Sequence, residues 1–414
     1  MISCLAMPSL VGGQEILLDS YQNVGVRSTG MGGAYLALSD DVSGLYHNPA
    51  GLARMRLPEI YSSFVHSSLQ NQSEFYGSNA TDDITSSRLG GVGVAYPFPV
   101  YQGSLVLAAS YAKRANFDQG LRVEGYDSEV QFDKSGFSRD RGSLGDFSFG
   151  GAIDLAMGVS LGITGFVWEG QNAFEQSLTL QDTQDAHADT VSLFSRFESL
   201  DTYTAVGGRA GLLYVHPSGN RLGLTVRPPV RVEISSRLED EYVDEFDDGV
   251  EVYPTESFGD AYSYELPWEF GFGFAWTGQG LTATGDIVYS DSRRTTYDAG
   301  SINVSPNVDD FETQYRAKPR VHLGLEYSLR NQPFRVRAGY FRNPVTYVGG
   351  GGLPAIDVRE ERQGITFGAS AEAQQALVLD VAVVLNRYRQ GEGRREDNIR
   401  TTRLFASLSY RFLQ

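Results

Sequence analysis

The chain has 414 residues, an apolar fraction of 41% and a formal net charge of −17, from 34 Lys and Arg against 51 Asp and Glu. An acidic chain with no basic stretch repels nucleic-acid phosphate, so we expect no nucleic-acid partner. One Cys excludes a disulfide framework, and with five His we expect no metal and no cofactor. Abundant Gly, Tyr and Phe favour many short strands over a helical enzyme.

Residues 1–24 precede the first recognisable motif. They contain a short apolar stretch without Lys or Arg. This composition fits either the tail of a signal peptide whose start is missing or an ordinary disordered terminus. The whole chain has no run of about 20 apolar residues, so we predict no membrane-spanning helix.

Residues 25–56 are predicted to form a compact segment that does not belong to the strand pattern. Gly30, Gly32 and Gly33 lack the Lys and Ser or Thr that a phosphate-binding loop needs after its glycines. Ser39, Asp40 or Asp41 can cap a short helix over residues 42–46. Asn48 can cap a second helix, with Pro49 at its first position, where the missing N–H costs nothing. Small residues would let such a segment fold tightly inside a tube.

Residues 57–414 alternate between apolar and polar side chains with period two, as strands do when the two faces of a sheet differ. Alternation fits both a soluble sandwich and a membrane barrel, which is apolar outside. The lengths of the connections distinguish the sandwich from the barrel, because short and long connections alternate along the chain. Short ones are predicted near residues 97–102, 157–158, 217–220, 277–280, 330–333 and 374–376, and long ones near 69–87, 115–142, 170–201, 238–263, 291–315, 343–361 and 390–398. We therefore predict an all-β fold, a fourteen-stranded antiparallel transmembrane β-barrel.

The segment 25–56 carries a family resemblance. Gly30-Met31-Gly32-Gly33-Ala34, Ser39-Asp40-Asp41 and Tyr46-His47-Asn48-Pro49-Ala50-Gly51-Leu52 resemble the N-terminal region of the FadL-like outer-membrane transport family. That family includes long-chain fatty-acid and aromatic-hydrocarbon transporters, and PorV-type barrels of a secretion system are its relatives. The resemblance implies a small hatch inside the barrel lumen. It assigns hatch or gating roles to Gly30, Met31, Gly32, Gly33, Asp40, Asp41, Asn48, Pro49 and Ala50.

The resemblance also implies a function. We expect a bacterial outer-membrane protein, in contact with outer-membrane lipids and lipopolysaccharide, that takes up a hydrophobic small molecule passively and is not an enzyme. The alternative is a PorV-like barrel whose partner is a secreted protein held at its loops. A diffusion porin is disfavoured, because a hatch would obstruct the pore.

Candidate ligand residues come from the face that the alternation turns inward, where seven acids and seven Arg nearly balance. These charges can form salt bridges that dock the hatch, or one Arg can bind a ligand headgroup. Arg335 and Arg337 are the best headgroup candidates, since they are two cations on one face. Phe166, Trp168 and Phe405 can line a groove for an apolar tail or pack on the hatch. The acid-rich segment 238–260 is predicted to be a solvated exterior loop, which divalent ions could bridge to lipopolysaccharide phosphates.

Overall fold

The computed structural model describes residues 23–156, 158–298, 311–349, 355–374 and 376–412. Residues 1–22, which hold most of the predicted signal remnant, lie outside the described residues. Among the described residues, no helix is long and apolar enough to cross a membrane.

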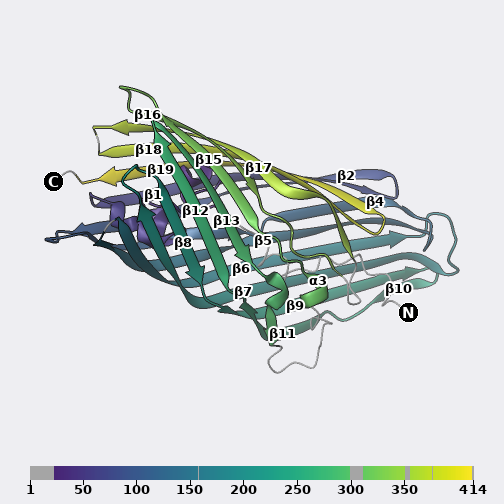
Figure 1. Cartoon of the computed structure of the whole chain (residues 1–414). Helices are drawn as coiled ribbons and strands as arrows, with labels where there is room; N and C mark the ends of the chain where they lie inside the picture. The colour runs from purple at the N-terminus through teal and green to yellow at the C-terminus, as the bar shows by residue number, and fades with distance from the viewer. Residues whose placement is uncertain (1–22, 157, 299–310, 350–354, 375, 413–414) are drawn as a thin grey trace.

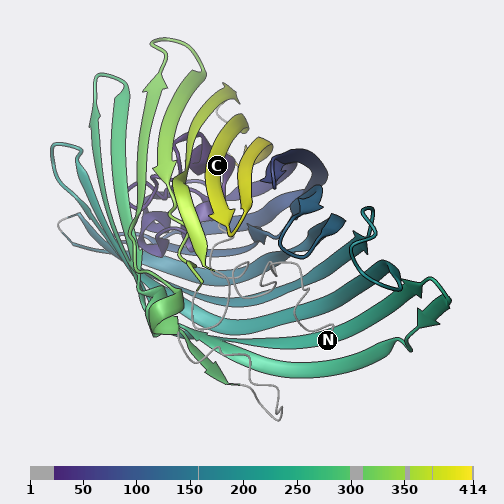
Figure 2. The ribbon, with the colours of Figure 1, turned by 90° about the vertical axis from the view of Figure 1, so that its right-hand side faces the viewer.

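The described strand segments join into fourteen antiparallel strands, and pairing of the last with the first closes the barrel (Figures 1 and 2). This confirms the predicted fold. In order, the strands are β1 (Glu59–Phe75), β2 (Ser78–Phe98), β3 (Leu105–Asn116) with β4 (Gln119–Asp127), β5 (Phe132–Ala156), β6 (Val159–Gln181), β7 (Thr190–Val215), β8 (Arg221–Arg227) with β9 (Val230–Phe246), β10 (Gly249–Val252) with β11 (Glu256–Leu266) and β12 (Glu269–Gly278), β13 (Leu281–Ser290) with β14 (Thr296–Asp298), β15 (Arg320–Ser328), β16 (Phe334–Arg342), β17 (Ile356–Ala373), β18 (Leu377–Glu392) and β19 (Arg395–Arg411).

Four of these strands are interrupted, one of them twice, and prolines lie in three of the breaks. Pro228 and Pro229 separate β8 from β9, Pro254 lies between β10 and β11, and Pro267 separates β11 from β12. Proline has no N–H to donate to the ladder, so pairing stops there. Between β13 and β14 the chain forms the 3-10 turn η4 (Ser292–Arg294), which Asp291 caps. The break between β3 and β4 falls at Phe117 and Asp118.

An apolar belt covers the outer face of the barrel near the short connections. Alternate side chains of β12, from Trp268 to Trp276, are exposed, as are those of β19 from Leu404 to Phe412. On β5 the belt runs from Phe147 to Leu155, although the strand begins at Phe132. An apolar outer band of alternate residues is what a membrane-spanning barrel presents to lipid.

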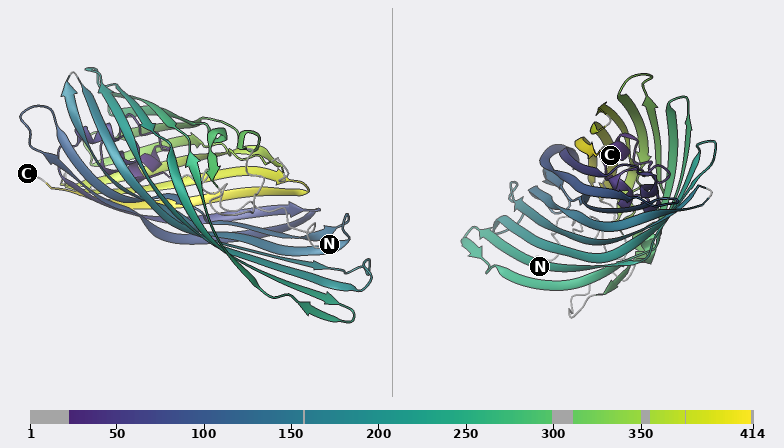
Figure 3. Two further views of the ribbon diagram at one scale, coloured as in Figure 1. Left: turned by 90° about the horizontal axis from the view of Figure 1, so that it is seen from below. Right: turned by 90° about the vertical axis from the view of Figure 1, so that its left-hand side faces the viewer.

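The predicted long loops are wrong, because most of these segments are strands. Beyond the belt, β1 to β7 continue as long hairpins that project from one side of the barrel (Figure 3). The acid-rich segment 238–260 is likewise no loop, since β9 pairs with β10 and β11. Beyond the belt the outer face of a strand meets water and is polar, while the inner face stays buried and mixes polar residues such as Asp82 with apolar ones such as Phe75. The period-two signal in the sequence therefore weakens although the hydrogen-bonded ladder continues.

Candidate functional site

The N-terminal segment, residues 24–56, lies inside the barrel and is nearly all buried (Figure 2). We call it the luminal segment. It consists of α2 (Val26–Gly30) and two 3-10 helices, η2 (Val42–Leu45) and η3 (Pro49–Arg54). Asp41 caps η2 by accepting from the Ser43 N–H, and Asn48 caps η3 by accepting from the Ala50 N–H. These are the two caps that the sequence predicts.

Glycines allow the luminal segment to lie directly against the wall. Gly32 and Gly33 have φ of +67° and +82°, a region that side chains disfavour. On the wall, a Cβ at Gly162 would lie 2.3 Å from the Pro49 carbonyl carbon, and one at Gly223 would lie 2.2 Å from the Leu36 oxygen. Backbone therefore packs on backbone, at a separation that any larger residue would prevent.

A buried ion-pair network docks the luminal segment to the wall. Arg27 donates to both carboxylate oxygens of Glu326, at 3.0 and 2.9 Å. Glu326 also accepts from Arg337 at 2.6 Å. Arg337 in turn pairs with Asp380 at 2.6 Å, and its side chain is 1% exposed. Because opposite charges surround it, Arg337 belongs to a salt-bridge network of the kind that was the alternative to headgroup binding.

The other charged candidates are also engaged in ion pairs. Arg335 pairs with Glu372 at 2.8 Å, close to the short connection before β18. Asp40 accepts from Arg27 at 2.6 Å and from Arg221 of β8 at 3.1 Å. Asp40 therefore links the luminal segment to the wall, whereas its neighbour Asp41 serves as the helix cap.

Polar side chains hold the backbone of the luminal segment at further points. The Asp286 carboxylate accepts from the Tyr35 and Leu36 N–H groups, at 2.5 and 2.8 Å. The Asn48 amide donates to the Leu36 and Leu212 carbonyls. The remaining motif residues pack among these anchors. Met31 is fully buried, and Thr366 donates to the Gly30 carbonyl and accepts from the Gly32 N–H.

His47 is buried within the luminal segment. Its Nε2 lies 2.8 Å from the Val24 carbonyl oxygen, and its ring contacts Tyr35 and Tyr46 edge-on. Burial lowers the pKa of His47 from 6.5 to about 4, because the low-polarity surroundings disfavour the charged imidazolium.

An aromatic cluster occupies the lumen on the side of β5 to β11. Phe166 and Trp168 stack with ring centroids 4.7 Å apart, and both are buried. The rest of this cluster consists of aliphatic residues and five further aromatic ones, Phe117, Tyr203, Tyr264, Tyr315 and Tyr347. Two of the three predicted tail-groove residues therefore lie together in an apolar environment.

Arginines border the aromatic cluster. The guanidinium of Arg114 lies 3.8 Å from the Trp168 ring centroid, a close cation–π contact, and that of Arg227 lies at 5.9 Å. Arg227 is 3% exposed, and its Nε and Nη1 lack a hydrogen-bond partner. Its nearest acid, Glu269, is 3.8 Å away and pairs with Arg320. Two guanidinium groups therefore lie near the Trp168 ring, whose Nε1 donates to the buried Asp146 carboxylate at 2.9 Å.

The alternation of the sequence placed Arg227 on the inward face but gave no reason to select it as a candidate. It did not place Arg114 on that face. A register shift between Lys113 and Ala115 turns Arg114 inward and breaks the alternation. No feature of the sequence marks that bulge. The Pro228-Pro229 pair after Arg227 does mark an interrupted strand.

Phe405 belongs to a different part of the lumen. It packs with Val26 of the luminal segment and with Phe341 and Val384 of the wall. It also lines a cavity of about 60 Å³, beside Arg403 and Asn116. This volume corresponds to about two water molecules. The structure therefore places Phe405 against the luminal segment, as the packing alternative has it.

A seam divides the wall between the second and third strands. β3 pairs with β2 only over Gly91–Phe98, and in the described ladders residues 78–90 of β2 have a backbone partner only in β1. β4 pairs with β5 and lies toward the lumen, where a Cβ at Gly120 would be 2.2 Å from the Asp82 carboxylate.

Two arginines bridge the seam. Arg88 of β2 donates to the Asp118 carboxylate at 2.6 Å and to the Gly142 carbonyl at 2.9 Å. Arg139 of β5 pairs with Asp82 of β2. Phe117, between the seam residues Asn116 and Asp118, is itself part of the aromatic cluster. The seam and the cluster are therefore adjacent.

Comparison with known proteins agrees with this geometry. No family model and no curated protein matches the sequence. Three solved structures match nearly the whole length of both chains. They are the Pseudomonas putida toluene transporter TodX (14% identity, 95% of this chain and 100% of that one, TM-score 0.61), the Ralstonia pickettii toluene transporter TbuX (13%, 96% and 99%, 0.61) and a Pseudomonas aeruginosa FadL homologue (13%, 95% and 100%, 0.63). The chain therefore has the fold of the FadL-type barrels, as its sequence resemblance implied.

Proposed function

We propose that the protein is an outer-membrane channel for passive uptake of hydrophobic small molecules such as long-chain fatty acids. The luminal segment acts as its hatch. The observation that carries this proposal is the stacked Phe166–Trp168 pair beside the incompletely paired Arg227. An aromatic surface suits an apolar tail, and a buried guanidinium suits a carboxylate head.

The seam supplies an exit in this proposal. A molecule on the aromatic cluster contacts Phe117, and beyond Phe117 only side chains close the wall between β2 and β3. Sideways movement at the end of this gap nearest Gly91, where Leu89 begins the exposed apolar side chains of β2, would deliver an apolar molecule to the edge of the membrane without crossing the luminal segment. The toluene transporters with the same fold support a hydrophobic substrate of this kind.

Binding of a fluorescent long-chain fatty acid to the purified barrel tests the proposal. Trp168→Ala should weaken binding about tenfold, as expected when an aromatic contact worth about 1.5 kcal/mol is lost. Trp276→Ala is the matched control, because Trp276 lies in the outer belt. Equal affinities for the wild type and both variants would contradict a ligand site at the aromatic cluster.

Mass spectrometry of molecules extracted with the barrel identifies the natural ligand. We expect an acyl or aromatic compound that Trp168→Ala fails to retain. The alternative, a PorV-like role, draws support from the long hairpins that project beyond the belt. Co-purification of a secreted protein without any hydrophobic compound would favour that alternative.

A further inference from the structure

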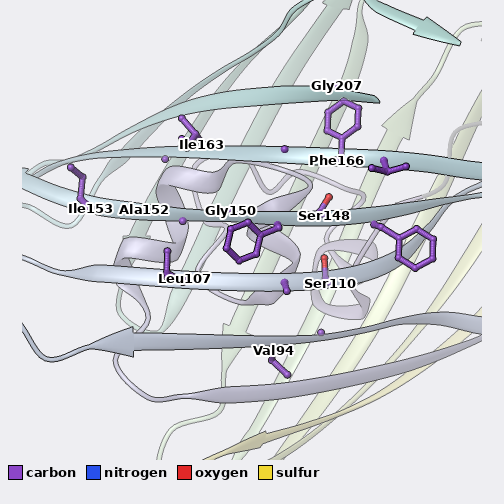
Figure 4. A pocket seen from close by; sticks show the side chains of 18 of the residues that line it. Val94, Leu107, Ser110, Ser148, Gly150, Ala152, Ile153, Ile163, Phe166 and Gly207 are labelled. Atoms are coloured by element: carbon purple, nitrogen blue, oxygen red, sulfur yellow. The ribbon is translucent and has the colours of Figure 1, made fainter. Parts of the chain in front are cut away.

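An apolar groove of about 1140 Å³ runs over the outer face of β2 to β7, within the belt (Figure 4). Large exposed side chains form its walls, among them Phe149, Ile163 and Val206, which are 63%, 69% and 74% exposed. Its floor contains Gly151 and Gly165, and Gly165 pairs with Gly208 of the next strand. Glycines at these positions leave a channel between the side chains, wide enough for acyl chains.

A second, polar groove of about 880 Å³ continues the first one beyond the belt. Phe147 lines both grooves, so they meet along β5. Arg88, Arg141 and Glu169 line the polar groove. Among the described residues, Arg141 has no hydrogen-bond or ion-pair partner.

The charge of the polar groove favours an anionic headgroup. Arg141 is the cation of the groove without a partner in the described part of the chain, whereas Arg88 pairs with Asp118. Lys113 does not line the groove, but it donates at 2.8 Å to the hydroxyl of Ser143, which does. Arginine and lysine bind phosphate, and the exposed Glu169 carboxylate can accept hydrogen bonds from sugar hydroxyls.

We propose that the two grooves form a specific site for the phosphorylated glycolipid of the outer leaflet, the lipid A part of lipopolysaccharide. Its phosphate faces Arg141, its sugar hydroxyls face Glu169, and an acyl chain lies over Gly165. A phosphate, a sugar and an acyl chain are the three chemistries that these neighbouring surfaces match. The site lies on the outer wall and does not depend on what the lumen transports.

Native mass spectrometry of the full-length, detergent-solubilised barrel tests the site, with bisphosphorylated lipid A as the probe. Arg141→Ala should lower the affinity about tenfold through loss of a charge-assisted contact. Gly165→Leu should lower it to a similar extent by filling the groove. The barrel should tolerate this change, because the nearest heavy atom to a Cβ at Gly165 is 4.0 Å away.

Matched controls come from the opposite wall. Arg342, an exposed cation at the end of β16, and Gly285, on the outer face of β13, receive the same substitutions, Arg342→Ala and Gly285→Leu. We expect wild-type affinity from both controls and about tenfold weaker binding of dephosphorylated lipid A to the wild type. Equal losses in test and control variants, or phosphatidylethanolamine bound as tightly as lipid A, would overturn the proposal in favour of ordinary lipid contact.

Discussion

Glu326→Ala should release the luminal segment from the wall. Glu326 is 5% exposed and accepts three charge-assisted hydrogen bonds, two from Arg27 and one from Arg337. Its removal leaves two buried guanidinium groups with only part of their counter-charge, Asp40 for Arg27 and Asp380 for Arg337. Breaking a buried ion pair in this way costs about 3–5 kcal/mol. If that cost falls on docking, the undocked population rises by roughly two to four orders of magnitude.

Conductance of single barrels in a planar bilayer measures this release, since an undocked segment unblocks the lumen. We expect frequent openings in Glu326→Ala and rare ones in the wild type. Glu372→Ala is the control, because its ion pair with Arg335 lies on the wall and does not involve the luminal segment. If Glu326→Ala conducts no more than Glu372→Ala, the ion-pair network does not hold the hatch.

Three further expectations follow from the same contacts. Arg88→Ala removes a bridge across the seam and should speed fatty-acid uptake into proteoliposomes severalfold; unchanged or slower uptake would argue against a lateral exit. Gly162→Ala should destabilise docking by about 1–3 kcal/mol, which would be measured as faster proteolysis of the luminal segment. Gly165→Ala should leave the proteolysis rate unchanged. The buried His47 stays neutral in the docked state, so docking should lose up to about 3 kcal/mol of stability as pH falls from 6.5 towards 4. Channel openings that do not increase over this pH range would refute a role of His47 in docking.

The sequence predicts the barrel well because its signal comes from the membrane. Where one face of a strand meets lipid and the other a polar lumen, apolar residues must alternate, as on β12 and β19. The same physics explains why the alternation does not predict the hairpins beyond the belt. Residues 78–88 of β2 pair with β1 but carry no alternation, because water bathes the outer face and polar contacts occupy the inner one.

The helices of the luminal segment were predictable for a different reason. Their caps depend on local rules, so Asn48 could be assigned from neighbouring residues alone, and the cap of η2 could be narrowed to Ser39, Asp40 or Asp41, of which the structure has Asp41. Glu326 and Arg337 lie directly opposite each other on the β15–β16 hairpin, so their contact follows from the hairpin register. Partners across the lumen follow no local rule, and Arg27 joins this pair through Glu326 only because the barrel closes around the luminal segment. Parity could show that Glu326 and Arg337 face inward but not that Arg27 meets them.

The arrangement of charge differs between the luminal segment and the aromatic cluster. Around the luminal segment, acids and arginines balance, so Arg337 and Arg27 are satisfied by Glu326, Asp380 and Asp40. Beside the aromatic cluster, Arg114, Arg209, Arg227 and Arg320 surround Glu269, while the buried Asp146 carboxylate accepts from the Trp168 Nε1. Paired charge stabilises the docked luminal segment, and the unused donors of Arg227 are the feature on which the proposed anion site relies. The proposed ligand site therefore lies outside the docking network, where these donors remain unused.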